Sequence, residues 1–476
     1  MQYDSLTHIL SDARDRALEI LFVDGSNDES TLTIDQLWQQ AVALLGELQH
    51  RGMHTGDELI IYANSNRRFL IAFWAALLGG IVPVPIAVGS NDEHRAKLFR
   101  IMRQLKHATL YTDHEQRRRL EDYARPRDYA DIMRQLRSHA LVDEELTGGK
   151  SGEPVDRTED AMAFIQYSSG STSDPKGVCL THANLTSNIA AIVEGTGWTA
   201  TDRSLSWMPL THDMGLIGFH LSVLAAGMHH AIMDTGVFVR RPLLWLLKAQ
   251  EYGATQLCSP NFGYKHFLKV FRSKGLDNLD LSAVRLILNG AEPISWALCE
   301  EFLEAMAPYG LKKSTMLPVY GLAEATVAVS IPRPGRQYER IVVDRHDLKI
   351  GQPFTPLDDD ADDAVSFVKV GRAVRDCEIR IVNDDDRVLD DAVVGNIQVR
   401  GKNVTRGIYG DPGAADALFA DDRWLRTGDC GGIVDGELVI TGRARELIIV
   451  NGQNYYPHDL EEMIARLDAL DLGKVV

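Results

Sequence analysis

The chain has 476 residues, too long for one ordinary hydrophobic core, so we expect two or more domains. Apolar residues make up 45% and charged residues 25% of it, a composition typical of soluble globular proteins. The formal net charge of −17, from 50 basic and 67 acidic residues, excludes a broad nucleic-acid-binding surface, which requires a basic face.

The cysteines and the first residues predict the compartment. Five cysteines without CxxC spacing or a pairing pattern favour the reducing cytoplasm over secretion. Residues 1–10 lack the basic start and apolar core of a signal peptide. The uncharged span 69–88 is long enough to cross a bilayer, but its glycines and prolines would interrupt a helix. We therefore expect a buried helix at 67–78, a buried strand at 81–86 and no membrane span.

Strand and helix patterns alternate along the first 330 residues. Residues 33–50 place an apolar face on one side of a helix, with Thr33 as the expected N-cap, and a strand is expected at 58–62. Further strands and helices follow in pairs at 161–165 and 183–193, 254–258 and 262–271, and 284–288 and 296–305. This alternation predicts parallel sheets covered by helices. The predicted fold class is α/β, with αβα layers over about 1–330.

The pattern changes after about residue 330. Short β-branched runs separated by Gly and Asp turns lie at 378–382, 396–400 and 437–440. They predict a β-rich subdomain over about 331–441, either a small antiparallel barrel or a sheet. The aspartates of 358–363 predict a solvated loop.

The end of the chain predicts the start of a further α+β subdomain at 442–476. A strand pattern at 445–450 precedes a helix pattern at 459–467, and the chain then stops at Val475-Val476. We expect this subdomain to be incomplete.

A run of small and hydroxylated residues, Tyr167 to Val178, follows the strand predicted at 161–165. Small residues let backbone N–H groups approach an anion, hydroxyls add donors, and Lys176 adds positive charge, so the run predicts phosphate binding. It is not a Walker loop, because no glycine directly precedes the lysine and no Ser or Thr directly follows it. The alternative is an ordinary solvated loop.

Five further motifs lie downstream. His212 stands beside a glycine turn, and small residues around Gly290 leave room for a flat ring. Tyr320 offers an aromatic plate near the carboxylate of Glu324, and Asp429 is suited to a ribose diol. The motifs are Trp207-Met208-Pro209 with His212-Asp213-Met214-Gly215, Asn289-Gly290-Ala291-Glu292-Pro293, Tyr320-Gly321-Leu322-Ala323-Glu324, Arg426-Thr427-Gly428-Asp429 and Gly442-Arg443.

Together with the Ser/Gly/Thr run, these motifs resemble the adenylate-forming superfamily of acyl-CoA synthetases, luciferases and peptide-synthetase adenylation domains. The resemblance runs from about Thr33 to Glu461, so 1–441 is expected to be the N-terminal domain of that superfamily. The chain looks most similar to the fatty acyl-AMP ligases, which have an insertion near 344–370. This narrower match is carried by Tyr167-Ser168-Ser169-Gly170, Pro209, the run from His212 to Gly218, Pro260-Asn261-Phe262, the run from Tyr320 to Thr326, and Asn454-Tyr455-Tyr456-Pro457.

The resemblance implies that ATP and a fatty acid are joined to acyl-AMP with Mg²⁺, and that the acyl group passes to the phosphopantetheine thiol of an acyl carrier protein. The fatty carboxylate and the α-phosphate of ATP that it attacks are both anions. Cations and correctly oriented hydrogen-bond donors must therefore neutralise both of them. The implied catalytic residues are His212 at the acyl carboxylate, Thr172 and Lys176 at the phosphates, and Glu324 on Mg²⁺.

The resemblance also implies a nucleotide site and an acyl pocket. The nucleotide-binding residues are Ser168, Ser171 and Thr172 for phosphates, Gly290, Ala291, Glu292, Tyr320 and Gly321 around adenine, and Asp429 and Arg443 at the ribose. The candidate acyl pocket is lined by Gly215, Leu216, Ile217, Pro260, Asn261, Phe262 and Tyr264. Arg445 would mark the hinge to the last subdomain.

Each assignment has a plainer alternative. His212 with Asp213 could be a structural pair, Glu324 a carboxylate at a helix N-terminus, and Asp429 a turn residue. The acyl-pocket side chains are also those of an ordinary core. His229-His230 and the cysteines have no motif support and are interpreted as structural.

Two rival functions stay open. An acyl-CoA synthetase shares the first step and uses CoA as acceptor, although the 344–370 segment favours a carrier protein. A non-catalytic nucleotide- or acyl-adenylate-binding module is the other, because nothing after Gly442 matches the lysine that the superfamily carries in its C-terminal subdomain. We therefore expect this chain to bind ATP and acyl-AMP and to adenylate slowly. Ala323 and Ser173 depart from the common Thr and Gly, as in the acyl-AMP ligase branch.

Overall fold

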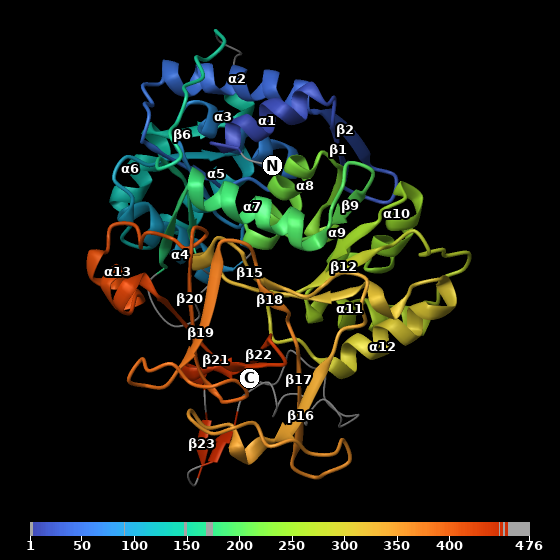
Figure 1. Cartoon of the computed structure of the whole chain (residues 1–476). Coiled ribbons are helices and arrows are strands. Elements are labelled where there is room, and N and C mark those ends of the chain that lie inside the picture. Colours follow the sequence, from blue (N-terminus) through green and yellow to red (C-terminus); the bar gives the residue numbers. More distant parts are fainter. Residues whose placement is uncertain are drawn as a thin grey trace. The chain divides into compact units, whose positions relative to one another are not determined.

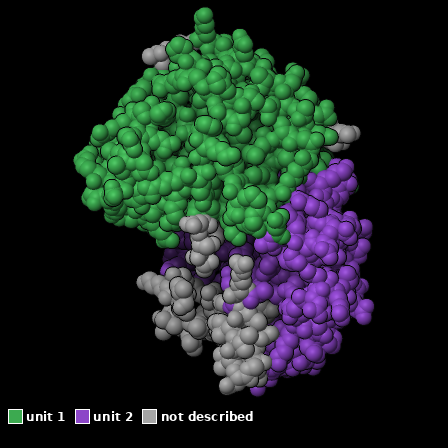
Figure 2. Space-filling view, turned by 90° about the vertical axis from the view of Figure 1, so that its left-hand side faces the viewer, with its two compact units in different colours: residues 1–194, 198–245, 405–416 green, residues 195–197, 246–404, 417–476 purple. Residues whose placement is uncertain are grey.

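The computed structural model describes residues 3–89, 91–146, 150–167, 175–446, 448–450 and 453–455. The chain forms two compact units, coloured separately in Figure 2. Unit 1 comprises residues 1–194, 198–245 and 405–416, and unit 2 comprises 195–197, 246–404 and 417–476. Figure 1 gives the positions of the elements along the chain.

Unit 1 contains two sheets that are mostly parallel. In the first, the strand order is β9 (Arg203–Ser206), β10 (His229–Met233), β1 (Glu19–Val23) and β2 (Glu29–Thr33), and only β1–β2 is antiparallel. In the second, the order is β4 (Val82–Pro85), β3 (Glu58–Ile61), β5 (Thr109–Thr112) and β6 (Ala140–Val142), all parallel. A hairpin of β7 (Met162–Tyr167) and β8 (Gly177–Thr181) flanks the Ser/Gly/Thr run.

Helices accompany these sheets. They are α1 (Leu6–Asp15), α2 (Ile34–His50), α3 (Asn66–Leu78), α4 (Asp92–Gln104), α5 (His114–Ala124), α6 (Ala130–Ser138), most of α7 (His182–Thr196), the π-helix η2 (Met214–Leu221), α8 (Ser222–Ala226), α9 (Thr235–Arg240) and most of α13 (Pro412–Leu418). The helix α10 (Leu243–Tyr252) begins in unit 1 and lies mostly in unit 2. Side chains from α4, α5 and α6 share one apolar core with β3, β4 and β5. Thr33 caps α2 in a capping box with Gln36, which confirms the predicted N-cap.

Unit 2 contains a parallel part and an antiparallel part. The parallel strands are β11 (Gln256–Cys258), β12 (Leu286–Asn289) and β13 (Met316–Pro318), joined through α11 (Asn261–Lys274) and α12 (Trp296–Met306). The antiparallel sheet runs in order β19 (Cys377–Val382), β20 (Gly395–Gly401), β21 (Leu425–Val434) and β22 (Glu437–Arg443).

The remaining elements among the described residues are short strands and 3₁₀ turns. The strands are β14 (Tyr320–Gly321), β15 (Ala328–Ile331) and β18 (Arg372–Ala373) in one sheet, the pair β16 (Arg340–Asp344) and β17 (Ala364–Val368), and the pair β23 (Ile448–Val450) and β24 (Gln453–Tyr455). The 3₁₀ turns are η1 (Asp143–Glu145), η3 (Ala307–Tyr309), η4 (Lys313–Thr315), η5 (Ala323–Ala325), η6 (Arg345–Asp347), η7 (Asp421–Arg423) and η8 (Ala444–Glu446).

The predicted α/β class is confirmed. The β-branched runs at 378–382, 396–400 and 437–440 lie in β19, β20 and β22 of one four-stranded antiparallel sheet, and the strands between 320 and 373 form two smaller antiparallel sheets. In place of a membrane helix, 69–88 holds most of α3, a glycine turn and β4, and within the described residues no helix has the length and apolarity to cross a bilayer. The strand expected at 445–450 was placed too early, because residues 444–446 form η8, and among the described residues that follow, 448–450 form β23. The helix expected at 459–467 lies outside the described residues, and the predicted domain boundaries stay predictions.

Candidate functional site

His212 of unit 1 follows β9 and precedes the π-helix η2. Its Nδ1 lies 2.8 Å from Asp213 Oδ1, and 40% of the His212 side chain is exposed. Burial lowers the pKa of His212, whereas the hydrogen bond and charge of Asp213 raise it, and the net direction is upward. The pair therefore favours an imidazolium at a partly accessible position, which suits a role beside an anion.

The π-helix η2 carries the residues predicted for the acyl pocket of unit 1. Leu216 and Ile217 are fully buried, as in an ordinary core. At Gly215, a Cβ atom would come within 2.2 Å of Pro209 O, so only glycine fits there. π-helices are rare and frequently occur at functional sites.

The phosphate residues are only partly described. Lys176 is exposed and directly precedes β8. Ser168, Ser171 and Thr172 lie outside the described residues, and so does the side chain of Arg445.

In unit 2 the structure brings together three predicted nucleotide residues. Tyr320 donates its hydroxyl to Asp429 Oδ2 at 2.6 Å, and Arg443 Nε lies 3.3 Å from Asp429 Oδ1. Asp429 and Arg443 are cross-strand partners in β21 and β22. Burial raises the pKa of Asp429, although Tyr320 and Arg443 both oppose this by stabilising its carboxylate. Since the Asp429 side chain is only 10% exposed and that of Arg443 is 66% exposed, the site is a buried acceptor beside a solvated cation.

Glu324 is half-buried on η5, and the backbone after it turns sharply. Thr326 has φ 70° and ψ −67°, and the N–H of Val327 donates to Ala325 O at 2.9 Å. These values define a classic γ-turn, a rare and strained conformation, and positive φ is a marked outlier for a β-branched residue. Such strain costs about 1–3 kcal/mol and tends to cluster at functional sites.

Gly321 is required by the same loop. A Cβ atom there would lie 1.6 Å from Val327 O, and this carbonyl also accepts from Leu322 N–H at 3.0 Å.

We expect Gly321→Ala to lower the free energy of unfolding by about 3 kcal/mol. The added methyl group would clash with a backbone atom, which cannot move aside as the end of a side chain can. Thermal melting measures this against Gly413→Ala, whose Cβ would meet nothing closer than 3.6 Å. Equal melting temperatures for the two variants would contradict the expectation.

The strand end before Gly290 forms a second cluster in unit 2. Glu292 Oε1 accepts from Phe262 N–H at 2.6 Å, Asn261 Nδ2 donates to Pro293 O, and Asn289 Nδ2 donates to Asn261 Oδ1 at 3.4 Å. The side chain of Glu292 is thus engaged at the start of α11, which leaves backbone around Gly290 as the adenine-facing candidate. Ala291 has φ 72°, a second positive value for a non-glycine residue.

The acyl residues predicted in unit 2 differ in exposure. Phe262 is 50% exposed and stacks on His266 with ring centroids 5.6 Å apart, whereas Tyr264 is fully buried. Pro260 is the N-cap residue of α11. Phe262 is therefore the accessible apolar candidate of this group.

Mg²⁺ fits the chemistry of these residues. Among the described residues, no group of three or more His, Cys, Asp or Glu side chains could hold a metal ion by itself. Mg²⁺ is commonly bound by one or two carboxylates together with substrate phosphates, so the single carboxylate of Glu324 matches that mode.

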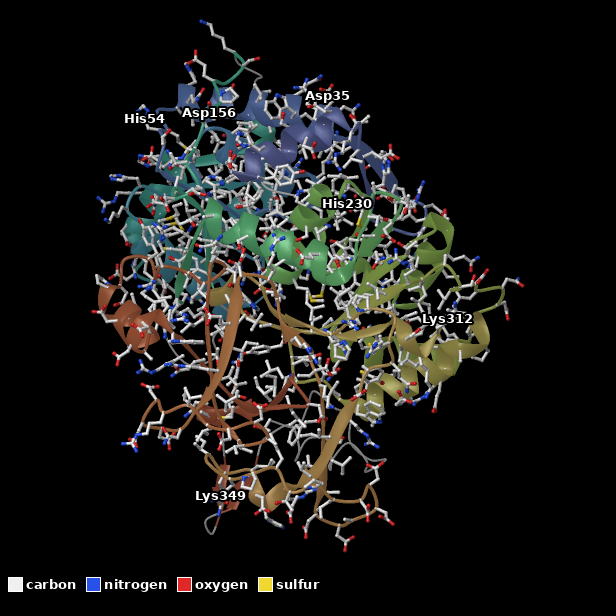
Figure 3. The ribbon with its side chains drawn as sticks, in the orientation of Figure 1. Asp35, His54, Asp156, His230, Lys312 and Lys349 are labelled. Carbon is white, nitrogen blue, oxygen red and sulfur yellow. The ribbon has the colours of Figure 1, made fainter. Side chains whose placement is uncertain are left out.

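Sequence reasoning missed two arrangements. One is a buried chain in unit 1, in which Trp74 Nε1–H donates to His220 Nε2 and His220 Nδ1 lies 3.0 Å from His230 Nε2 (Figure 3 labels His230). The other is the contact of Asn403 with the Glu324 loop, 79 residues away along the chain. Neither follows a local sequence pattern, because each joins residues far apart in the chain.

The chain is similar in sequence to a family model and to known proteins. The family model described as AMP-binding enzyme matches residues 11–409. The long-chain-fatty-acid–AMP ligase FadD32 of Mycolicibacterium smegmatis is 32% identical over 467 residues, covering 92% of this chain and 73% of that protein. A putative acyl-CoA synthetase of Caulobacter vibrioides is 33% identical over 442 residues, covering 90% and 74%.

A solved structure shares the fold over nearly the whole chain. The fatty acyl-adenylate ligase of L. pneumophila, in complex with acyl adenylate and pyrophosphate, has a TM-score of 0.84 at 30% identity. The match covers 97% of this chain and 81% of that one.

Proposed function

Because the chain belongs to the AMP-binding enzyme family, we propose that it is a fatty acyl-AMP ligase, which joins a fatty acid to ATP and releases pyrophosphate. The superfamily and its ligase branch predicted from the sequence are confirmed by the relatives. One observation carries the proposal: the hydroxyl of Tyr320 donates a hydrogen bond to Asp429 Oδ2 at 2.6 Å, although the two residues belong to motifs 109 residues apart.

The proposed roles follow from the chemistry of each side chain. Asp429 accepts hydrogen bonds from the two ribose hydroxyls, and Tyr320 orients that carboxylate as well as lying against adenine. His212, whose pKa Asp213 raises, offers positive charge to the acyl carboxylate and α-phosphate. Lys176 offers charge to the phosphates. Such groups act by stabilising charge that develops in the transition state.

Glu324 is the proposed ligand of Mg²⁺. The ion supplies Lewis-acid neutralisation of the phosphate oxygens when it is bound. The role of the chain is to hold the Glu324 carboxylate at one place on the loop after β14.

The proposed acceptor of the acyl group is the phosphopantetheine thiol of a carrier protein. This choice is supported by the similarity to a long-chain-fatty-acid–AMP ligase. The segment 344–370, where the sequence resembles the insertion of the fatty acyl-AMP ligases, contains the end of β16 and all of β17. The similarity to a putative acyl-CoA synthetase keeps CoA as the competing acceptor.

Fatty-acid-dependent exchange of pyrophosphate into ATP tests the function, together with calorimetric binding of a non-hydrolysable acyl-adenylate analogue. Fatty acids of increasing length are compared, and CoA or a carrier protein added to the same reaction identifies the acceptor. We expect Glu324→Gln to lower exchange at least tenfold at limiting Mg²⁺, because the neutral amide binds the ion more weakly. Failure of the unaltered chain both to bind the analogue and to exchange would reject the proposal.

A further inference from the structure

We propose that Asn403 and Thr326 are positioning residues that hold the Glu324 loop in its strained form. The inference rests on the proposed role of Glu324 in binding Mg²⁺. Asn403 follows β20, and Thr326 lies two residues after Glu324. Both side chains are buried, with exposed fractions of 1% and 0%.

Three hydrogen bonds join Asn403 to this loop. Thr326 Oγ1–H donates to the backbone O of Asn403 at 2.6 Å. The Nδ2 of Asn403 donates to Ala325 O at 3.2 Å and to Ala328 O at 3.1 Å. These hydrogen bonds hold the side chain of Thr326, the central residue of the γ-turn, and the backbone carbonyls of Ala325 before it and Ala328 after it.

The loop is also closed by its own backbone. Ala325 N–H donates to Leu322 O and Thr326 N–H donates to Ala323 O, each at 3.0 Å. These local bonds bracket Glu324. Because strained backbone persists only where its surroundings determine it, the buried contacts of Asn403 explain why Thr326 keeps a positive φ.

The consequence concerns the position of the carboxylate. An ordinary turn after Ala325 would redirect the chain between Glu324 and β15, and the Glu324 side chain would no longer be held in one place. A metal ligand that is displaced by a fraction of an ångström binds its ion less tightly. The hydrogen bonds of Asn403 therefore affect the affinity of Glu324 for Mg²⁺.

The test compares variants that remove the contacts and preserve their shape. Thr326→Val deletes the hydroxyl, and Asn403→Asp deletes the two Nδ2 donors. For both we expect hydrogen–deuterium exchange in the 320–330 peptide to accelerate at least tenfold, and the Mg²⁺ concentration for half-maximal pyrophosphate exchange to rise about tenfold. Thr326→Ser keeps the hydroxyl and should stay within about twofold of the unaltered chain. Asn278→Asp, at an exposed position, controls for the added charge.

Two results would overturn the inference. One is unchanged deuterium exchange in 320–330 for both variants. The other is unchanged Mg²⁺ dependence with only a lower melting temperature, which is the result expected of ordinary core contacts. If the unaltered chain shows no pyrophosphate exchange, the proposed function fails separately, and the deuterium exchange still decides whether Asn403 holds the loop.

Discussion

Asp429→Ala is expected to lower both the affinity for an acyl-adenylate analogue and the rate of pyrophosphate exchange by about 10²–10³. The carboxylate is the proposed acceptor of hydrogen bonds from two ribose hydroxyls, and hydrogen bonds to a charged acceptor are roughly twice as strong as neutral ones. Its side chain is 10% exposed, so water does not readily replace the lost acceptor. Calorimetry with the analogue and the exchange assay measure the two quantities.

Two variants separate ribose binding from structural damage. Tyr320→Phe removes only the hydroxyl that orients Asp429, and we expect a loss of less than about tenfold because the charged acceptor remains. Asp390→Ala removes an exposed carboxylate of the same unit and should change neither quantity. Binding of the analogue by Asp429→Ala within twofold of the unaltered chain would show that Asp429 does not contact the ribose.

The free energy of unfolding is expected to fall by several kcal/mol between pH 7 and pH 5. Burial, followed by the charges of Arg157 and His8, lowers the pKa of His182 to about 4. Burial next to neighbouring histidines lowers the pKa of His230 to about 3 and that of His220 well below its usual value of 6.5. All three stay neutral in the folded chain, where His182 accepts from Leu6 N–H at 3.2 Å and His220 accepts from Trp74.

The sign follows from proton uptake. The unfolded chain binds these protons as the pH falls through 6.5, whereas the folded chain binds them only near the lowered values. The stability is therefore complete above 6.5 and is lost on acidification, by about 2 kcal/mol each for His182 and His230 down to pH 5, and His220 changes the stability in the same direction. Relief of charge repulsion as the pH nears the isoelectric point of about 5.3 acts in the opposite direction.

Urea denaturation at a series of pH values measures the slope. His182→Asn keeps an acceptor for Leu6 N–H without a titrating ring, and should reduce the loss by about 2 kcal/mol. His54→Asn, at an exposed position labelled in Figure 3, should leave the slope unchanged. A pH-independent free energy of unfolding for the unaltered chain would mean that the buried histidines are solvated or already charged.

Local residue patterns were sufficient to predict most of the helices and strands. The capping box at Thr33, the apolar face of α2 and the alternation of strands with helices predicted the α/β class and most element positions, because helix caps and apolar periodicity depend on neighbouring residues alone. The motifs around His212, Tyr320, Glu324 and Asp429 predicted the candidate site in a different way, through their resemblance to the adenylate-forming superfamily. The error at 445–450 arose because a strand pattern there gave no sign of the η8 turn.

The sequence by itself determined which chemical groups the chain carries and which family it belongs to. Only the tertiary structure decided that Tyr320 donates to Asp429, that Asn403 holds the turn at Thr326, and that Trp74, His220 and His230 form one buried chain. Each of these contacts joins elements that are distant in sequence, so its geometry depends on packing across the sheets. No residue pattern within a short window contains that information.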